Sequence, residues 1–130
     1  MRANLTTITA ISLLCISPAS NASAQGLKQF SGVAAFYSAD YSGRTARGDR
    51  YDPNKFTAAH RSLPFGTQLR VTDPKSRRSV VVVVNDRGPF TKGRVLDFSL
   101  AAAKALHMTG RGLMRVTAEI QSAAAYSTLQ

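Results

Sequence analysis

The longest run of apolar residues after the first 24 positions is Val80–Val84, and the turn-forming sequence Asn-Asp-Arg-Gly-Pro follows it at once. Valine is β-branched and packs well on a pleated surface, so this run predicts a strand that ends at the turn. Successive side chains of a strand point to opposite faces, which places Asp86 on the same face as Val82 and Val84. The pattern therefore puts a carboxylate in line with a row of valines.

Alternating and β-rich segments, separated by Gly, Pro, Asn and Asp, predict the other elements of the chain. A helix is expected over 100–107, because Ser99 can cap it and glycines follow its end. Five or six short strands with one helix, and no alternation of strands with helices, predict a mainly β protein with a small barrel. The segments expected to be strands are 30–37, 56–60, 67–72, 80–84, 94–98 and 112–120.

The first 24 residues have the pattern of a secretory signal peptide. Arg2 precedes an apolar stretch over 5–16, and an Ala-Ser-Ala cleavage motif occupies 22–24. Such a segment is too short to span a bilayer and is removed after export. Cys15 follows Leu14, whereas a lipoprotein signal needs a small residue before its cysteine. We therefore expect a periplasmic or secreted protein with no stable membrane anchor.

The mature chain is expected to be a single domain over 25–130, with a barrel core over about 31–120. Cleavage removes only Arg2 among the 17 Lys and Arg and none of the seven acids, which leaves a formal charge of +9. This excess favours a polyanionic partner, although a basic surface can also be merely solvated. For an exported protein we expect a wall polymer and no nucleic acid. We also expect a monomer.

Two residues at predicted strand ends are candidates for chemistry, and each has a structural alternative. Asp86 is either a partly desolvated acid or the acceptor of an Asx turn, paired with Arg87. His60 is either a catalytic group or a structural side chain that ends a strand. The mature chain has no cysteine, and two scattered histidines give no ligand spacing, so we expect neither a metal nor another cofactor.

Five segments stand out in the chain, Gly32–Tyr37, Thr45–Asp52, Thr57–Thr67, Val84–Phe90 and Arg94–Ser99. In this order they resemble the rare lipoprotein A family, and the resemblance covers nearly all of residues 31–120. It implies a six-stranded double-psi β-barrel, the fold of expansins, barwin-like proteins and some endoglucanases. It also implies a lytic transglycosylase that cuts the glycan strands of peptidoglycan, with a preference for strands without stem peptides.

Carried over position by position, the resemblance implies three catalytic residues, Asp49, His60 and Asp86. Glycoside cleavage needs a proton at the leaving oxygen, and desolvation among valines would favour the protonated form of Asp86. A transglycosylase uses the C6 hydroxyl of its substrate as the nucleophile, so no second carboxylate is needed to position water. His60 and Asp49 then serve as hydrogen-bonding or charge-orienting groups. Most family members carry Glu where this chain has Asp49.

Nearby aromatic and basic side chains are candidates for substrate binding. Three tyrosines could stack on sugar faces, and two arginines could pair with muramyl carboxylates; barrel packing and solvation are the alternatives. Two functions of other classes remain open, a non-catalytic expansin-like module that binds or loosens the wall, and a secreted inhibitor or effector. The substrate-binding candidates are Tyr37, Tyr41, Tyr51, Arg44 and Arg87.

Overall fold

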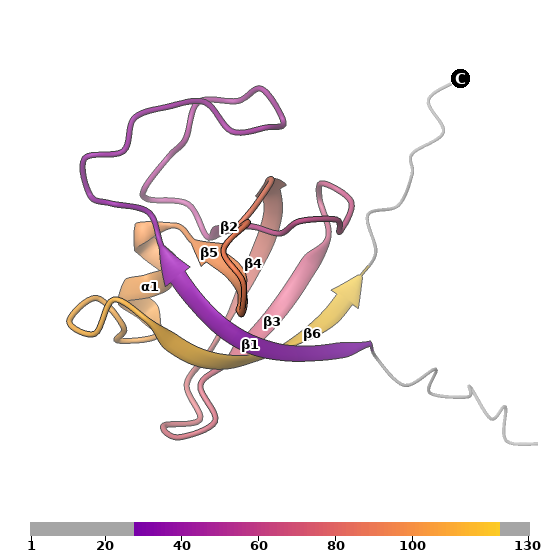
Figure 1. Cartoon of the computed structure of the whole chain (residues 1–130), viewed down its shortest axis with the longest axis vertical. Helices are drawn as coiled ribbons and strands as arrows, with labels where there is room; N and C mark the ends of the chain where they lie inside the picture. The colour runs from indigo at the N-terminus through magenta and orange to yellow at the C-terminus, as the bar shows by residue number, and fades with distance from the viewer. Residues whose placement is uncertain (1–27, 123–130) are drawn as a thin grey trace, which may run out of the picture.

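The computed structural model describes residues 28–122, so the predicted signal peptide over 1–24 lies outside the described residues. Six strands and one helix follow one another along this part of the chain (Figure 1). The predicted barrel with one short helix is confirmed. The elements are β1 (Gln29–Phe36), β2 (Thr57–Ala59), β3 (Gln68–Thr72), β4 (Ser79–Asp86), β5 (Arg94–Phe98), α1 (Leu100–Ala105) and β6 (Met114–Ser122).

The strands close into a barrel in the order β1-β5-β2-β4-β3-β6, and β6 pairs back with β1. The β1–β5 and β2–β4 pairs are parallel, whereas the other four pairs are antiparallel. Both parallel pairs join strands that are far apart in the sequence, so each needs a long crossover connection. The loop between β1 and β2 is the first part of the path from β1 to β5.

Strand β4 has the alternation that its sequence predicts. Val82 and Val84 are fully buried, Asp86 is 9% exposed, and Val81 on the opposite face is 40% exposed. The register with β3 pairs Val82 with Leu69, which is also buried in the core. The prediction that Asp86 continues the buried row of valines is confirmed.

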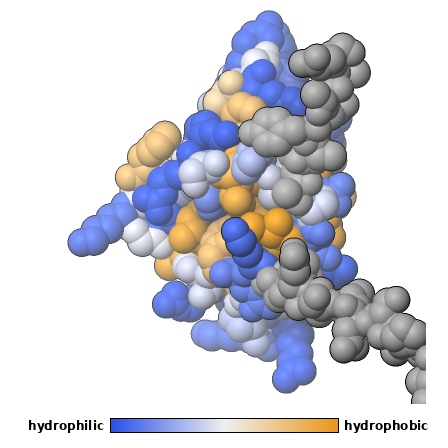
Figure 2. Space-filling model, turned by 90° about the vertical axis from the view of Figure 1, so that its right-hand side faces the viewer, coloured by the Kyte–Doolittle hydropathy of each residue, from blue (hydrophilic) through white to orange (hydrophobic). Residues whose placement is uncertain are grey.

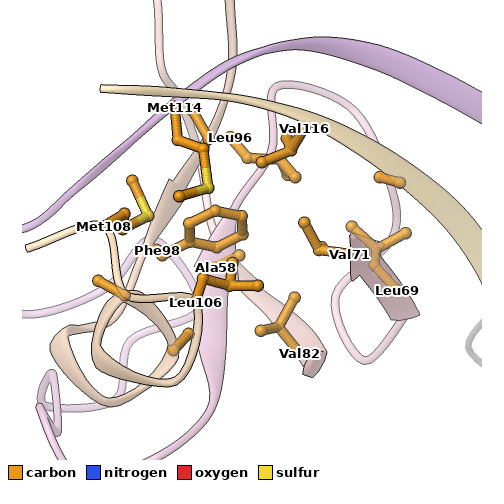
Figure 3. Close-up of a cluster of buried hydrophobic side chains, with 14 of the residues drawn as sticks. Ala58, Leu69, Val71, Val82, Leu96, Phe98, Leu106, Met108, Met114 and Val116 are labelled. Atoms are coloured by element: carbon orange, nitrogen blue, oxygen red, sulfur yellow. The ribbon is translucent and has the colours of Figure 1, made fainter. Parts of the chain in front are cut away.

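The core is centred on Phe98, the last residue of β5 (Figure 3). Leu106 and Met108, from the turn after α1, close one side of this cluster, and both are fully buried. Ser99 caps the helix as predicted, because its Oγ accepts a hydrogen bond from the Ala102 N–H at 3.3 Å. The helix is shorter than predicted, since the chain turns after Ala105 to bury these two side chains.

The two ends of the barrel differ. The long loop 37–56 arches over one end, and the hairpin 73–78 between β3 and β4 projects from the other (Figure 1). Asp86 lies at the loop end of β4, and the hairpin joins its opposite end. Eight strand residues at about 3.3 Å each separate these two points by about 25 Å. Within residues 28–122, no helix has the length and apolar character needed to cross a membrane.

Candidate functional site

The carboxyl group of Asp86 is held by three hydrogen-bond donors. Its Oδ1 accepts from the backbone N–H groups of Ala46 at 2.7 Å and Arg87 at 2.8 Å. Its Oδ2 accepts from the hydroxyl of Tyr37. The end of β1, the long loop and the end of β4 therefore meet at one carboxyl group. Because Oδ1 faces two N–H donors, a proton on this group is placed on Oδ2, beside the Tyr37 hydroxyl.

The three predicted tyrosines form one aromatic cluster next to Asp86. The rings of Tyr37 and Tyr41 stack with centroids 5.0 Å apart, and Tyr51 meets Tyr37 edge-on at 4.8 Å. Burial, followed by the hydrogen bond to Asp86, raises the pKa of Tyr37 above the ordinary range of a phenol. Tyr37 therefore remains a hydroxyl donor at neutral and moderately alkaline pH.

The structure corrects the assignment of Tyr51 as a sugar-stacking residue. Tyr51 is 5% exposed, and its hydroxyl accepts the backbone N–H of Leu100 at 3.0 Å at the start of α1. Its ring is packed inside the cluster and presents no face to a ligand. Tyr41 is 38% exposed and keeps a face toward solvent. Sequence could not distinguish them, because both lie in the same irregular loop.

His60 has a structural contact that its sequence position does not reveal. Its Nδ1 accepts the backbone N–H groups of Ser62 at 3.1 Å and Leu63 at 3.0 Å. An accepting Nδ1 carries no proton, so the imidazole is the neutral tautomer with hydrogen on Nε2. Burial, and then the charges of Arg61 and Arg87, lower the pKa of His60. His60 therefore caps its own loop and can act as a hydrogen-bond donor only through Nε2.

We expect His60→Asn to keep the loop and remove a pH dependence of stability. The amide oxygen can accept the N–H groups of Ser62 and Leu63, whereas His60→Ala removes the acceptor at a cost of about 1 kcal/mol. The pKa of His60 is lower in the folded chain, so the unfolded chain binds the proton more readily. Its contribution to stability is thus present above pH about 6.5 and is lost as the pH falls further.

Urea unfolding of wild type and both variants at pH 7.5 and pH 5 measures this effect. Wild type should lose more stability than His60→Asn between the two pH values. An identical loss in the two proteins would contradict the assigned tautomer.

Arg87 does not pair with Asp86 through its side chain, which corrects one of the two interpretations of this turn. Its Nη1 donates to the carbonyls of Leu63 at 2.8 Å and His60 at 3.2 Å, and its guanidinium lies 3.9 Å from the ring centroid of Phe65. These contacts join the end of β4 to the loop after β2. Arg87 therefore positions the loop that contains His60. Its Nη1 donates to the two carbonyls of that loop and not to a substrate carboxylate.

Asp49 lies on the exposed surface of the loop. Its side chain is 66% exposed and pairs with Arg47 at 3.5 Å, while its backbone carbonyl accepts the N–H of Thr45 at 2.8 Å. Gly48 makes this tight turn with a φ of +104°, which few other residues adopt. Arg44 is exposed and donates to the Gly48 carbonyl at 3.0 Å. The turn places the Ala46 N–H against Asp86, so the motif supports the carboxyl group through its backbone.

Phe90 was not among the predicted site residues. It lies four positions after Asp86 and is 78% exposed, more than the other large apolar side chains of the described chain that reach the surface. An apolar residue directly after the Gly-Pro turn was the available sequence signal. An exposed aromatic ring is suited to stacking on a ligand face.

Solved structures similar to this chain share its barrel. A Streptomyces papain inhibitor matches with a TM-score of 0.58 at 22% identity, over 71% of this chain and 93% of the inhibitor. An apo expansin from Clavibacter michiganensis matches with a TM-score of 0.56 at 25% identity, over 73% of this chain and 52% of the expansin. The predicted expansin-like double-psi barrel is therefore confirmed.

Several curated proteins with similar sequences are named as peptidoglycan transglycosylases. A protein of Nostoc sp. named "Probable endolytic peptidoglycan transglycosylase RlpA" is 54% identical over 94 residues, which are 70% of this chain and 25% of that protein. The Pasteurella multocida protein named "Endolytic peptidoglycan transglycosylase RlpA" is 44% identical over 90 residues, 68% of this chain and 31% of that protein. The chain thus spans about a quarter to a third of the length of these two relatives.

These names confirm the resemblance to the rare lipoprotein A family. The sequence model of a family described as "Lytic transglycolase" matches residues 29–118, which include all three candidate catalytic positions. Because this match covers more than half of the sequence, the chain belongs to the lytic transglycolase family.

Proposed function

We propose that this domain cleaves the glycan strands of peptidoglycan as an endolytic transglycosylase and leaves 1,6-anhydro-muramyl ends. The observation that carries the proposal is the buried carboxyl group of Asp86, fixed by Tyr37 and two backbone N–H groups at the end of the barrel. A general acid must be held in a defined direction to deliver its proton. The names of the similar curated proteins support the same reaction.

In the proposed reaction, Asp86 gives the proton on Oδ2 to the glycosidic oxygen as the bond from that oxygen to C1 of the muramyl residue breaks. The C6 hydroxyl of the same residue attacks C1 and closes the anhydro ring. Its proton passes to the Asp86 carboxylate, which restores the acid. One carboxyl group thus acts first as acid and then as base, and no water is consumed.

Substrate contacts are proposed for the exposed aromatic rings near this carboxyl group. Tyr41 and Phe90 present faces to solvent, whereas Tyr37 and Tyr51 are packed in the aromatic cluster. His60 can donate through Nε2 to a sugar hydroxyl, and Arg44 lies exposed on the loop. We further propose that the protein acts outside the cytoplasm, as its predicted signal peptide implies, and that it is a monomer.

Product analysis tests the proposed function. Residues 25–130 are incubated with purified sacculi and with peptide-free glycan, and the products are examined by mass spectrometry. Anhydro-muramyl ends are expected from both substrates, in larger amount from the peptide-free glycan, with the same yield in the presence of EDTA. Binding without any anhydro ends would instead assign an expansin-like module, and reducing ends would assign a hydrolase.

We expect Asp49→Ala to lower cleavage strongly without unfolding the domain. The pair with Arg47 is exposed, and such pairs contribute only about 0–1 kcal/mol to stability. If the carboxylate contacts substrate, its loss costs on the order of a hundredfold in rate, and Asp49→Glu, which restores the residue usual in the family, keeps or raises activity.

Asp40→Ala is the matched control, because Asp40 is an exposed acid of the same loop. Cleavage rates on peptide-free glycan and thermal unfolding midpoints are measured for all three variants. Wild-type turnover by Asp49→Ala would show that this carboxylate only balances surface charge, leaving Asp86 and His60 as the site.

A further inference from the structure

A pocket of about 200 Å³ lies away from Asp86, between the hairpin 73–78 and the segment that leads into β6. Lys75, Arg111 and Arg115 line it, and all three are exposed. Met114 is buried at 5% exposure, and Leu113 at the rim is 54% exposed. The pocket therefore combines cationic side chains with a small apolar surface.

Cations outnumber acids in the two segments that form this pocket. The hairpin 73–78 and the segment 106–115 together carry five Lys or Arg and one acid. The loop 38–55, at the Asp86 end of the barrel, carries four Lys or Arg and three acids. Hydrophilic side chains cover the hairpin end of the barrel (Figure 2). A local excess of cations over acids attracts anionic groups from solution. The five cations are Lys75, Arg77, Arg78, Arg111 and Arg115.

The one acid at this end is committed to its own turn. Asp73 is 2% exposed, its Oδ1 accepts the backbone N–H of Lys75 at 2.9 Å, and its Oδ2 accepts the Ser76 hydroxyl at 2.8 Å. Its carbonyl also accepts the N–H of Arg77 at 2.8 Å. Asp73 also lines the pocket, and its charge acts on Arg111. Because these donors hold both of its carboxylate oxygens, Asp73 shapes the hairpin, and the three lining cations outnumber this one acid.

We propose that this pocket binds the carboxylate ends of peptide stems on peptidoglycan, so that the domain holds the wall at a second site. The inference rests on the proposed function for its choice of polymer. Lys and Arg pair with a carboxylate through charge-assisted hydrogen bonds, and the apolar surface of Leu113 and Met114 fits a small aliphatic side chain. The separation from Asp86 allows one strand to be cut while stems of another are held.

Sedimentation with sacculi that carry intact stems, and with sacculi stripped of stems by an amidase, tests the proposal. The pocket variant is Lys75→Gln/Arg111→Gln. Lys55→Gln/Arg70→Gln is the control. Both residues are exposed and lie outside the pocket, and the two substitutions remove the same charge as those of the pocket variant. We expect the pocket variant to bind intact sacculi about fivefold more weakly than wild type. Its binding to stripped sacculi, its unfolding midpoint and its cleavage of soluble peptide-free glycan should be unchanged.

The proposed site would be overturned if the pocket variant bound both kinds of sacculi equally weakly, or if the control variant bound intact sacculi as weakly as the pocket variant. The weaker binding would then be an effect of net charge. Unchanged binding by the pocket variant would overturn it as well. Sedimentation measures binding and requires no cleavage, so it tests the pocket even if the proposed transglycosylase activity is absent. In that case wild type would bind intact sacculi through the pocket but release no anhydro-muramyl ends.

Discussion

Asp86→Asn is expected to reduce the release of anhydro-muramyl products by at least about a hundredfold, the lower end of what a general acid contributes. The amide cannot supply the proton that the glycosidic oxygen needs. It can, however, keep the local structure. Its oxygen can accept the N–H groups of Ala46 and Arg87, and its NH₂ can donate to the Tyr37 hydroxyl, which accepts as readily as it donates.

Asp86→Ala is the contrasting variant. It leaves two N–H groups at a part-buried site without an acceptor, and each unsatisfied donor of this kind costs about 1–3 kcal/mol. We expect it to lower the unfolding midpoint as well as the activity. The pair of variants therefore separates the loss of the acid from the loss of the loop that the carboxyl group anchors.

Mass spectrometry of digests of peptide-free glycan, together with thermal unfolding, measures both effects. Asp86→Asn should melt close to wild type and still bind glycan. Product release by this variant at more than about a tenth of the wild-type rate would remove Asp86 as the acid, because loss of an acid costs more than that.

Much of the fold could be predicted from the sequence because local patterns agree with the tertiary structure. The run of valines predicts β4 and the burial of Asp86, since alternation of side chains along a strand needs no knowledge of neighbouring strands. Ser99 predicts the start of α1, because a cap depends only on adjacent residues. The parallel pairing of β1 with β5 is non-local. The local pattern of residues therefore did not predict it.

The site was harder to predict because its contacts join distant segments. Tyr37 and Asp86 are 49 positions apart, and nothing near Tyr37 indicates that its hydroxyl meets a carboxylate. The contact of His60 is local, but a histidine that accepts two N–H groups looks the same in sequence as one that binds a ligand. The catalytic roles that the resemblance implies for Asp49, His60 and Asp86 stay predictions, and the structure shows that Tyr51 and Arg87 support the site from within.

Tyr37→Phe is expected to lower the maximal cleavage rate by about 10- to 100-fold, because a hydrogen bond to a charged group contributes about 1.5–3 kcal/mol. Phenylalanine keeps the stack on Tyr41 and the edge contact with Tyr51. It removes only the hydroxyl that fixes Oδ2 of Asp86. We therefore regard Tyr37 as a positioning residue for the acid, and this replaces its predicted role as a sugar-stacking side chain.

The split between the maximal rate and KM distinguishes this role from simple packing. A carboxyl group that is no longer fixed in direction delivers its proton less effectively, whereas the contacts that hold the glycan are unchanged. Tyr37→Phe should therefore lower the maximal rate and leave KM close to the wild-type value. Burial, followed by the hydrogen bond to Asp86, raises the pKa of Tyr37, so the wild-type hydroxyl stays a donor in the assay.

Tyr41→Phe is the matched control, because its hydroxyl donates to the carbonyl of Arg44 at 3.3 Å and not to the acid. Rates are measured over a range of concentrations of peptide-free glycan for wild type and both variants. Tyr41→Phe should keep the wild-type maximal rate. If Tyr37→Phe keeps it as well, the hydroxyl only packs the site, and the orientation of Asp86 must then depend on the N–H groups of Ala46 and Arg87 alone.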